Sequence, residues 1–234
     1  MHKPSSFFYF YAGIFLFLFS AAPGRSQQTL PDAPQNNTPQ ATAKRKWSDV
    51  LEPGEKIPPL YAKDKLMFPV HEELRLSGWF SPFLSAGWGQ LLDGHPKYGT
   101  DSGAFGERLG AAALRDLSMR TFSDGVLPAL LREDPRYFRK GEGSIVHRGL
   151  YAASRVFVTQ RDNGSSGFNN SVVLGHGMAS ALTLAYYPDA SVKTLVVFET
   201  WGTSLLGEAG GNLWSEFWPD ARKKIFHKRH RAQP

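Results

Sequence analysis

A stripe of polar side chains on one predicted helix offers groups for acid–base chemistry. Two carboxylates, Glu199 and Glu208, follow on the next segment, so a Ser–His pair with a carboxylate could be assembled from Ser180 and His176. However, Ser180 does not lie in a G-x-S-x-G turn, and a helical spacing of four residues is not the usual way to present a serine to a base. We therefore favour a hydrogen-bonded polar seam over a catalytic site. The stripe consists of His176, Ser180, Thr183 and Tyr187.

Four arginines lie on predicted helices in two pairs, and the members of each pair are seven residues apart. Residues spaced by seven share a helix face, and guanidinium groups suit the planar oxygens of carboxylates and phosphates. The pattern predicts either surface charges that are solvated or paired, or a weak anion-binding pocket. Spacing alone does not say whether the two pairs converge. The arginines are Arg108, Arg115, Arg148 and Arg155, and available acidic partners are Glu107, Asp116, Asp162 and Glu199.

Metal and nucleotide sites have little support in the sequence. The seven histidines are scattered, none forms an H-E-x-x-H motif, and there is no cysteine. The sequence Gly141-Glu142-Gly143-Ser144 lacks the lysine that follows in a phosphate-binding loop. We therefore expect no metal and no cofactor.

The C-terminal segment combines aromatic and basic side chains. Residues 217–231 carry six Lys or Arg and one acid, Asp220. Aromatic residues and cations on an amphipathic helix favour an anionic membrane surface. The alternative is an aromatic helix docked on the protein with a solvated basic end. The candidate membrane-surface residues are Trp214, Phe217, Trp218, Lys223, Lys224, Ile225, Lys228 and Arg229.

The elements that position these residues are predicted to be helices. Apolar residues recur at helical spacing, and possible N-caps are Asp101 or Ser102, Ser144, and Asn169 or Asn170. Residues 192–209 could form a strand, but we favour a helix because the apolar pattern continues. Gly210-Gly211 predicts a break or bend, and Pro219 is expected to divide the last apolar stripe. The predicted helices cover 71–93, 103–120, 123–131, 144–159, 169–187 and 192–209, and the last apolar stripe covers 213–225.

Small residues recur every three or four positions on three of these helices. This spacing lets helix backbones approach closely, either in a compact soluble core, which we favour, or against a membrane. The sets are Gly103, Gly106, Gly110 and Ala113; Gly149 and Ala153; and Gly177, Ala181 and Ala185.

The N-terminal residues predict export. Lys3 precedes an apolar run from Phe7 to Phe19, and small residues follow up to Ser26, which is typical of a cleaved signal peptide over 1–26. An uncleaved anchor is the alternative. Residues 27–70 are rich in proline, glutamine and asparagine and predict a disordered or extended spacer.

Length and charge limit the remaining possibilities. The chain has 234 residues, of which 41% are hydrophobic, enough for one packed domain. A mean hydropathy of −0.32 argues against a protein with several membrane spans. Residues 27–216 carry 19 basic and 20 acidic side chains, so the net charge of +6 reflects the ends of the chain. Nucleic-acid binding by the folded body is therefore disfavoured.

Several short sequences together carry a family resemblance over about residues 70–230. The chain resembles an uncharacterised family of secreted acidobacterial proteins, and its spacer resembles segments of acidobacterial envelope proteins. The resemblance implies a bacterial envelope location and carries no activity or catalytic residue. The matching sequences are Leu30 to Gln35, Leu127 to Arg139, Phe168 to Ser171, Ala185 to Pro188 and Glu216 to Asp220.

Together these observations predict an all-α protein: a single compact bundle of five or six helices over 71–218, followed by a basic tail over 219–234. We expect a non-enzymatic protein of the periplasm or outer membrane whose partner is an anionic membrane surface or another envelope protein. One alternative is a soluble scaffold that binds an envelope protein. The other is a periplasmic hydrolase of lipid or cell-wall material with His176, Ser180, Glu199 and Arg155 in one cleft.

Overall fold

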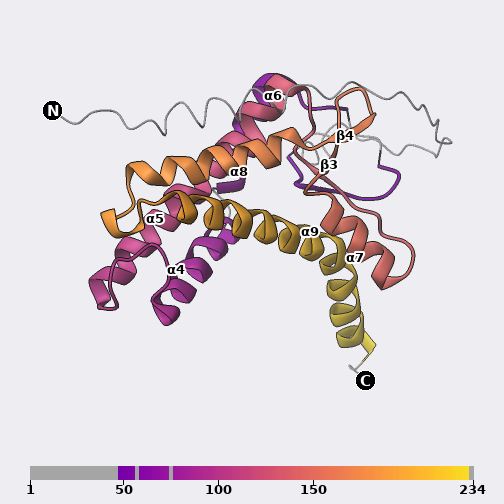
Figure 1. Ribbon diagram of the computed structural model, residues 1–234. Helices are drawn as coiled ribbons and strands as arrows, with labels where there is room; N and C mark the ends of the chain where they lie inside the picture. The colour runs from indigo at the N-terminus through magenta and orange to yellow at the C-terminus, as the bar shows by residue number, and fades with distance from the viewer. Residues whose placement is uncertain (1–46, 56–57, 74–75, 232–234) are drawn as a thin grey trace. The chain divides into compact units, whose positions relative to one another are not determined.

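The computed structural model describes residues 47–55, 58–73 and 76–231, and they are mostly helical (Figure 1). This confirms the all-α prediction. The expected signal peptide over 1–26, and residues 27–46 and 56–57 of the expected spacer, lie outside the described residues. The first described part of the chain holds the short strand β1 (Val50–Leu51), helix α3 (Ala62–Glu73), the 3₁₀ turn η1 (Leu76–Trp79) and helix α4 (Phe80–Leu92).

Three consecutive elements form the long helical segment that follows. Helix α5 (Ser102–Arg120) is capped by Asp101, whose side chain accepts a hydrogen bond from the Ala104 backbone N–H. A π-helical turn, η2 (Thr121–Val126), leads into α6 (Leu127–Leu131). Pro128 has no N–H, and its ring would clash with a preceding carbonyl in a regular helix, so the wider turn accommodates it.

The second half of the chain begins with small strands. Strand β2 (Tyr137–Phe138) pairs in parallel with β1, and β3 (Val158–Gln160) pairs antiparallel with β4 (Ser166–Phe168). Helix α7 (Ile145–Ser154) precedes β3, and α8 (Asn170–Leu182) follows β4. Turns η3 (Thr183–Ala185) and η4 (Asp189–Ser191) lead to α9 (Thr194–Arg231).

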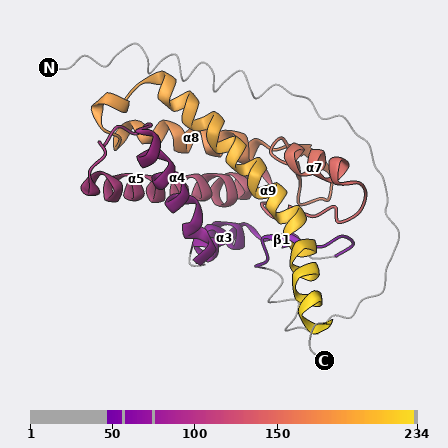
Figure 2. The same cartoon turned by 90° about the horizontal axis from the view of Figure 1, so that it is seen from below.

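Helix α8 is central to the packing of these elements. It contacts α5, η2 and α9, whereas α4 packs on α5, α7 on α9, and α3 on η2 and α6 (Figure 2). A Cβ atom on Gly175 would lie 2.7 Å from the Ser123 backbone nitrogen, so α8 and η2 approach each other through a glycine. Gly106 and Gly110 do not bring helices together in the core as expected, because a Cβ on either would meet no described residue within 4 Å.

Four expectations about element boundaries are corrected. Residues 62–70 are helical rather than extended, because the face of α3 that carries Phe68 and Pro69 is buried against η2 and α6. Helix α7 ends at Ser154 rather than near Thr159, since the chain then enters the β3–β4 hairpin. Helix α9 runs on through both Gly210-Gly211 and Pro219, so neither divides it, and the boundary placed at 218/219 lies inside this helix. It changes direction in its C-terminal part (Figures 1 and 2).

Other expectations about these elements are confirmed. Ser144 caps α7 by accepting a hydrogen bond from the His147 N–H, and Asn169 caps α8 by accepting one from Val172. The ambiguous residues 192–209 are helical from Thr194 onward.

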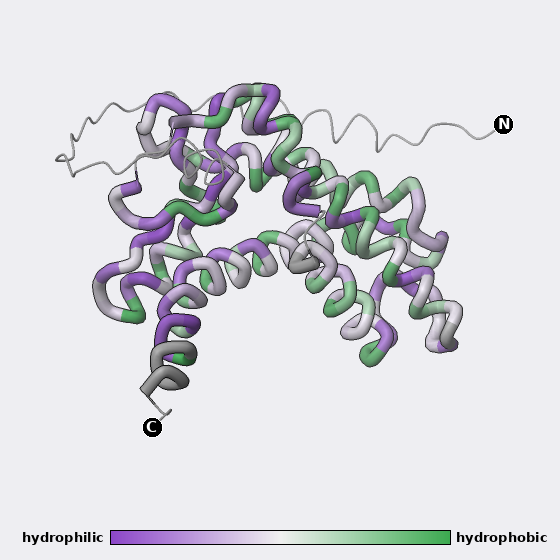
Figure 3. The backbone as a smooth tube through the Cα atoms, turned by 180° about the vertical axis from the view of Figure 1, so that it is seen from behind, coloured by the Kyte–Doolittle hydropathy of each residue, from purple (hydrophilic) through white to green (hydrophobic). Residues whose placement is uncertain are grey.

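Many polar and charged side chains are buried in this fold. The apolar core is small, with Ala111, Tyr187 and Val196 packed together beside Tyr98 and Tyr186. Many charged side chains are also buried, while many large apolar side chains are exposed. Figure 3 shows hydrophobic residues spread along the helices with hydrophilic ones between them. Many large apolar side chains therefore lie on the surface of the described fold.

Candidate functional site

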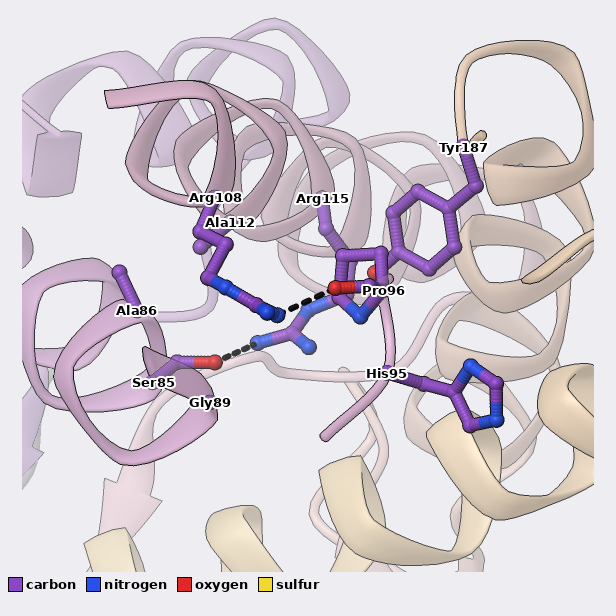
Figure 4. Close-up of a pocket in the computed structure, with 9 residues that line it drawn as sticks. All are labelled: Ser85, Ala86, Gly89, His95, Pro96, Arg108, Ala112, Arg115 and Tyr187. Atoms are coloured by element: carbon purple, nitrogen blue, oxygen red, sulfur yellow. Dashed lines mark hydrogen bonds between the residues drawn. The ribbon is translucent and has the colours of Figure 1, made fainter. Parts of the chain in front are cut away.

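Arg108 and Arg115 lie side by side between α4 and α5, where they line one small cavity (Figure 4). The Arg108 guanidinium is fully used in binding the loop between these helices. It donates to the Gln90 side chain, to the carbonyls of Gly94, Pro96 and Gly99, and to the Asp93 carboxylate. Five N–H groups therefore meet five acceptors, and Arg108 has no donor left for a ligand.

Arg115 is less completely satisfied than Arg108. It donates to the Ser85 hydroxyl at 3.3 Å and lies 3.7 Å from the Asp116 carboxylate, but its buried Nε–H has no partner among the described residues. The adjoining cavity has a volume of about 20 Å³, enough for one water molecule. Of the first predicted pair, only Arg115 could contribute to anion binding, and only a water-sized ligand would fit.

Arg148 and Arg155 do not join the first pair. The Arg148 Nε donates to the Glu216 carboxylate at 2.7 Å, and its Nη2 contacts Asp220 at 2.7 Å. The Arg155 guanidinium lies over the Tyr151 ring at 5.6 Å. The two pairs therefore lie in different parts of the fold, and Arg148 is already neutralised by carboxylates.

Glu216 is the best-satisfied carboxylate of the described chain. It is completely buried, and it accepts hydrogen bonds from Arg148, from the Tyr137 hydroxyl, and from the backbone N–H groups of Lys140 and Gly141. Burial alone would raise its pKa, but these donors outweigh burial and lower the pKa below its usual value. We interpret this network as structural, because every oxygen has its donors.

A second group of charges lies around Arg120, where α5 and η2 meet α8 and α9. Desolvation, followed by the charge of Glu208, raises the pKa of Asp124 to about 7, and Arg120 only partly offsets this. Desolvation also raises the pKa of Glu208. Asp116 is 1% exposed, and neither of its carboxylate oxygens has a hydrogen-bond donor among the described residues. Carboxylates thus outnumber cations in this part of the interior.

The polar stripe that begins on α8 is buried, as expected for the hydrogen-bonded seam predicted from the sequence. His176 is 1% exposed, and its Nδ1 lies 3.1 Å from the Ser204 hydroxyl of α9. Burial, helped by the charge of Arg115, lowers its pKa to about 4, so the ring is neutral at pH 7. Ser180 is buried as well, whereas Glu199 is exposed and Arg155 contacts Tyr151. The four residues considered for a hydrolase do not share a cleft.

The predicted membrane-surface residues lie on the C-terminal part of α9. The Trp214 and Trp218 rings stack at 4.6 Å and are 61% and 40% exposed, and Ile225 is 54% exposed. At 100° per residue these three positions lie within a narrow arc of the helix. Lys223 and Lys224 are exposed, and the backbone at Lys228 and Arg229 is helical. Phe217 differs from the rest, because it is partly buried beneath the Arg148 guanidinium at 4.7 Å.

Helix α4 carries a surface that sequence reasoning missed. Its small residues Pro82 and Ala86 are buried, whereas Trp79, at its N-cap, and six large apolar residues within it are exposed. Phe80, Leu84, Trp88 and Leu91 follow one another along one face. The sequence does contain an indication of this surface, because residues 80–92 include no charged residue. A helix exposed to water on one side ordinarily carries charged residues on that side. We call the following set the α4 surface: Trp79, Phe80, Phe83, Leu84, Trp88, Leu91 and Leu92.

Two further observations concern metals and membrane spans. Within the described ranges, no group of His, Cys, Asp and Glu could hold a metal ion. No helix among those residues is both long and apolar enough to cross a bilayer.

The chain has no counterpart in comparisons with known proteins. No protein-family model matches it, and no curated protein or solved structure matches it at a significant level. The resemblance to secreted acidobacterial proteins therefore stays a prediction.

Proposed function

We propose that this chain is a non-enzymatic protein of the bacterial cell envelope that binds peripherally to an anionic membrane surface. The observation that carries the proposal is the α4 surface. Its seven large apolar side chains are between 44% and 81% exposed, on a helix without a charged residue. An exposed apolar patch of this kind is typical of an interaction site.

The composition and length of α4 favour lipid over a protein partner. Two of its exposed residues, Trp79 and Trp88, are of the type enriched where headgroups meet acyl chains. At 1.5 Å per residue, its 13 residues extend over about 20 Å, less than the hydrocarbon core of about 30 Å. Such a helix is suited to lying in the interface, with its large side chains inserted among the lipids.

The C-terminal part of α9 supplies a second apolar stripe with cations beside it. Trp214, Trp218 and Ile225 are exposed on one side of the helix, and Lys223 and Lys224 are exposed as well. Asp220 is neutralised by Arg139 and Arg148, so it does not oppose an anionic surface. This combination supports the choice of anionic lipid.

A site-specific label tests the lipid contact, because the chain contains no cysteine. A Leu84→Cys variant of the full chain, labelled with an environment-sensitive fluorophore, is mixed with phosphatidylglycerol vesicles. We expect a blue shift and a rise in emission at this position. The matched control is Leu130→Cys, since Leu130 is 72% exposed on α6, and its label should not respond. This local readout is independent of any binding by the apolar run at 7–19.

Polar substitutions test how much the α4 surface contributes. Replacing Phe80, Leu84 and Leu91 together with serine should weaken vesicle binding on the order of 100-fold, because each inserted side chain contributes on the order of 1 kcal/mol. The control replaces the equally exposed Leu130, Ile145 and Leu206. The proposal would be contradicted if the emission of the label at position 84 did not change on addition of vesicles. It would also be contradicted if both triple variants lost vesicle affinity equally. Recovery of a stable complex with a soluble envelope protein instead of vesicles would favour the scaffold alternative.

A further inference from the structure

A cavity separate from the α4 surface lies between the start of α3 and the end of α6. Its volume is about 310 Å³, at the lower end of the range for pockets that hold small organic molecules. Part of its lining is apolar, chiefly Pro58, Pro59, Tyr61 and Ala129. The lining also includes the charged residues Lys65, Arg132 and Asp162. This mixed lining suits a ligand with an apolar body and one polar end.

The walls of the cavity are held in place by buried contacts. The Arg136 guanidinium donates to the Pro58 carbonyl at 3.2 Å, and Leu60 is 3% exposed. The buried Lys65 ammonium donates to the Pro128 carbonyl at 3.3 Å and to both oxygens of Asp162, at 2.6 and 2.7 Å. These contacts join α3, α6 and the loop after β3, so the cavity is preformed.

One positive charge remains uncompensated at this cavity. The Lys65–Asp162 ion pair uses the charges of both residues. Arg132 is exposed, and no described residue accepts a hydrogen bond from its guanidinium or forms an ion pair with it. The described residues that line the cavity therefore carry a net charge of +1, which favours an anion.

Arg132 occupies a backbone conformation that favours other residue types. Its φ angle is +56°, in the left-handed region where glycine and asparagine are favoured. The conformation is fixed on both sides, since the Arg132 carbonyl accepts from the Asp162 N–H at 2.9 Å and the Glu133 N–H donates to Pro128. The backbone thus gains nothing from arginine here, whereas a ligand at the cavity would use its side chain.

We propose that this cavity binds a small organic anion, a carboxylate on a compact apolar body, with the Arg132 guanidinium holding the carboxylate. The volume of about 310 Å³ is small for a ligand pocket, which favours a compact ligand. The apolar body contacts the proline and tyrosine wall, and the two carboxylate oxygens accept the paired N–H groups of the guanidinium. The proposal is independent of membrane binding, because it uses none of the residues of the α4 surface.

Titration calorimetry of the full chain with benzoate tests this assignment. Benzoate should bind, and benzyl alcohol, which has the same ring without the charge, should bind at least about ten-fold more weakly. Arg132→Asn should weaken benzoate binding by a similar factor while the melting temperature stays equal to or above that of the wild type, because asparagine tolerates the left-handed conformation. Loss of binding with retained stability separates a ligand contact from a folding defect.

Two further variants sharpen the outcome. Arg132→Lys keeps the charge but not the paired donors and should bind benzoate with intermediate affinity. Lys193→Gln removes an equally exposed cation from outside the cavity and should bind as the wild type does. The assignment is overturned if benzoate does not bind, if Arg132→Asn binds it unchanged, or if benzyl alcohol binds equally well.

Discussion

At the scale of single residues, the interior contains carboxylates whose protonation is linked to stability. Asp124 lies near Glu208 with only Arg120 to offset them, and its pKa is about 7. The folded protein therefore holds this proton up to about pH 7, whereas the unfolded chain releases it near pH 4. Because the folded pKa is raised, the stability that this group contributes is lost as the pH rises through that window.

Asp124→Asn should remove this dependence on pH. Asparagine remains neutral and can still accept the hydrogen bond from the Ser123 hydroxyl. We expect the variant to be more stable than the wild type at pH 8, by up to about 4 kcal/mol, and nearly equal to it at pH 4. Thermal melts followed by circular dichroism at both pH values measure the difference. Asp189→Asn, at an exposed position, is the control, and an equal gain for Asp124→Asn at both pH values would refute the linkage.

Glu216 provides a second test at this scale. In Glu216→Gln, an amide NH₂ replaces a carboxylate oxygen and faces hydrogen-bond donors that it cannot accept from. Asp220 would then be the one carboxylate still paired with the buried Arg148 among the described residues. Breaking a buried pair in this way should lower the unfolding free energy by about 3 kcal/mol or more. Urea unfolding measures it, with Glu199→Gln on the exposed face of the same helix as control. A loss no larger than that of the control would show that the network contributes little.

Sequence reasoning identified part of these charge interactions. The Arg115–Asp116 neighbours and the buried seam at His176 followed from spacing along one helix. The partners of Arg108 and Arg148 did not, because they are loop carbonyls and carboxylates brought near by tertiary packing. Helical periodicity describes which residues share a face, but it says nothing about the segment that will cover that face.

At the scale of elements, α4 and α9 show what patterns reveal and what they leave out. The caps at Asp101, Ser144 and Asn169 were predictable because capping is a local interaction. The continuity of α9 through Pro219 was not, since neighbouring contacts such as Glu216 with Arg148 hold the helix across the proline. The exposure of the large apolar side chains of α4 was also not predicted, because an apolar helix is ordinarily expected to lie in the core.

The cations of α9 should make vesicle binding depend on lipid charge. Replacing Lys223 and Lys224 together with glutamine should weaken binding to phosphatidylglycerol vesicles by about 30-fold, since each cation near an anionic surface contributes about 1 kcal/mol. Binding to phosphatidylcholine vesicles should not change, and co-sedimentation at low and high salt measures both. These substitutions leave the ion pairs of Asp220 intact, which a deletion from residue 219 would not. Equal losses with both lipids would rule out an electrostatic role.

At the scale of the whole described fold, polarity is distributed in an unusual way. Arginines and carboxylates such as Arg108, Asp116 and Glu216 are almost completely buried, while tryptophans and leucines are exposed. Burying charge is unfavourable unless it is paired, and exposing large apolar groups to water is unfavourable as well. Binding to a lipid interface would remove the exposed apolar side chains from water and would leave the buried charge pairs intact. The membrane proposal and the polar interior are therefore consistent with each other.

The bonds of Glu216 also have a consequence for the order in which the fold is completed. Arg148 is made 68 residues before Glu216, and its other carboxylate partner, Asp220, comes later still. During synthesis the Arg148 guanidinium is made before either counter-charge, and burying it without them would be unfavourable. The loop closed by this ion pair can form only after the last helix has been made. We therefore expect α7 to take its final position late, after α9 has been synthesised.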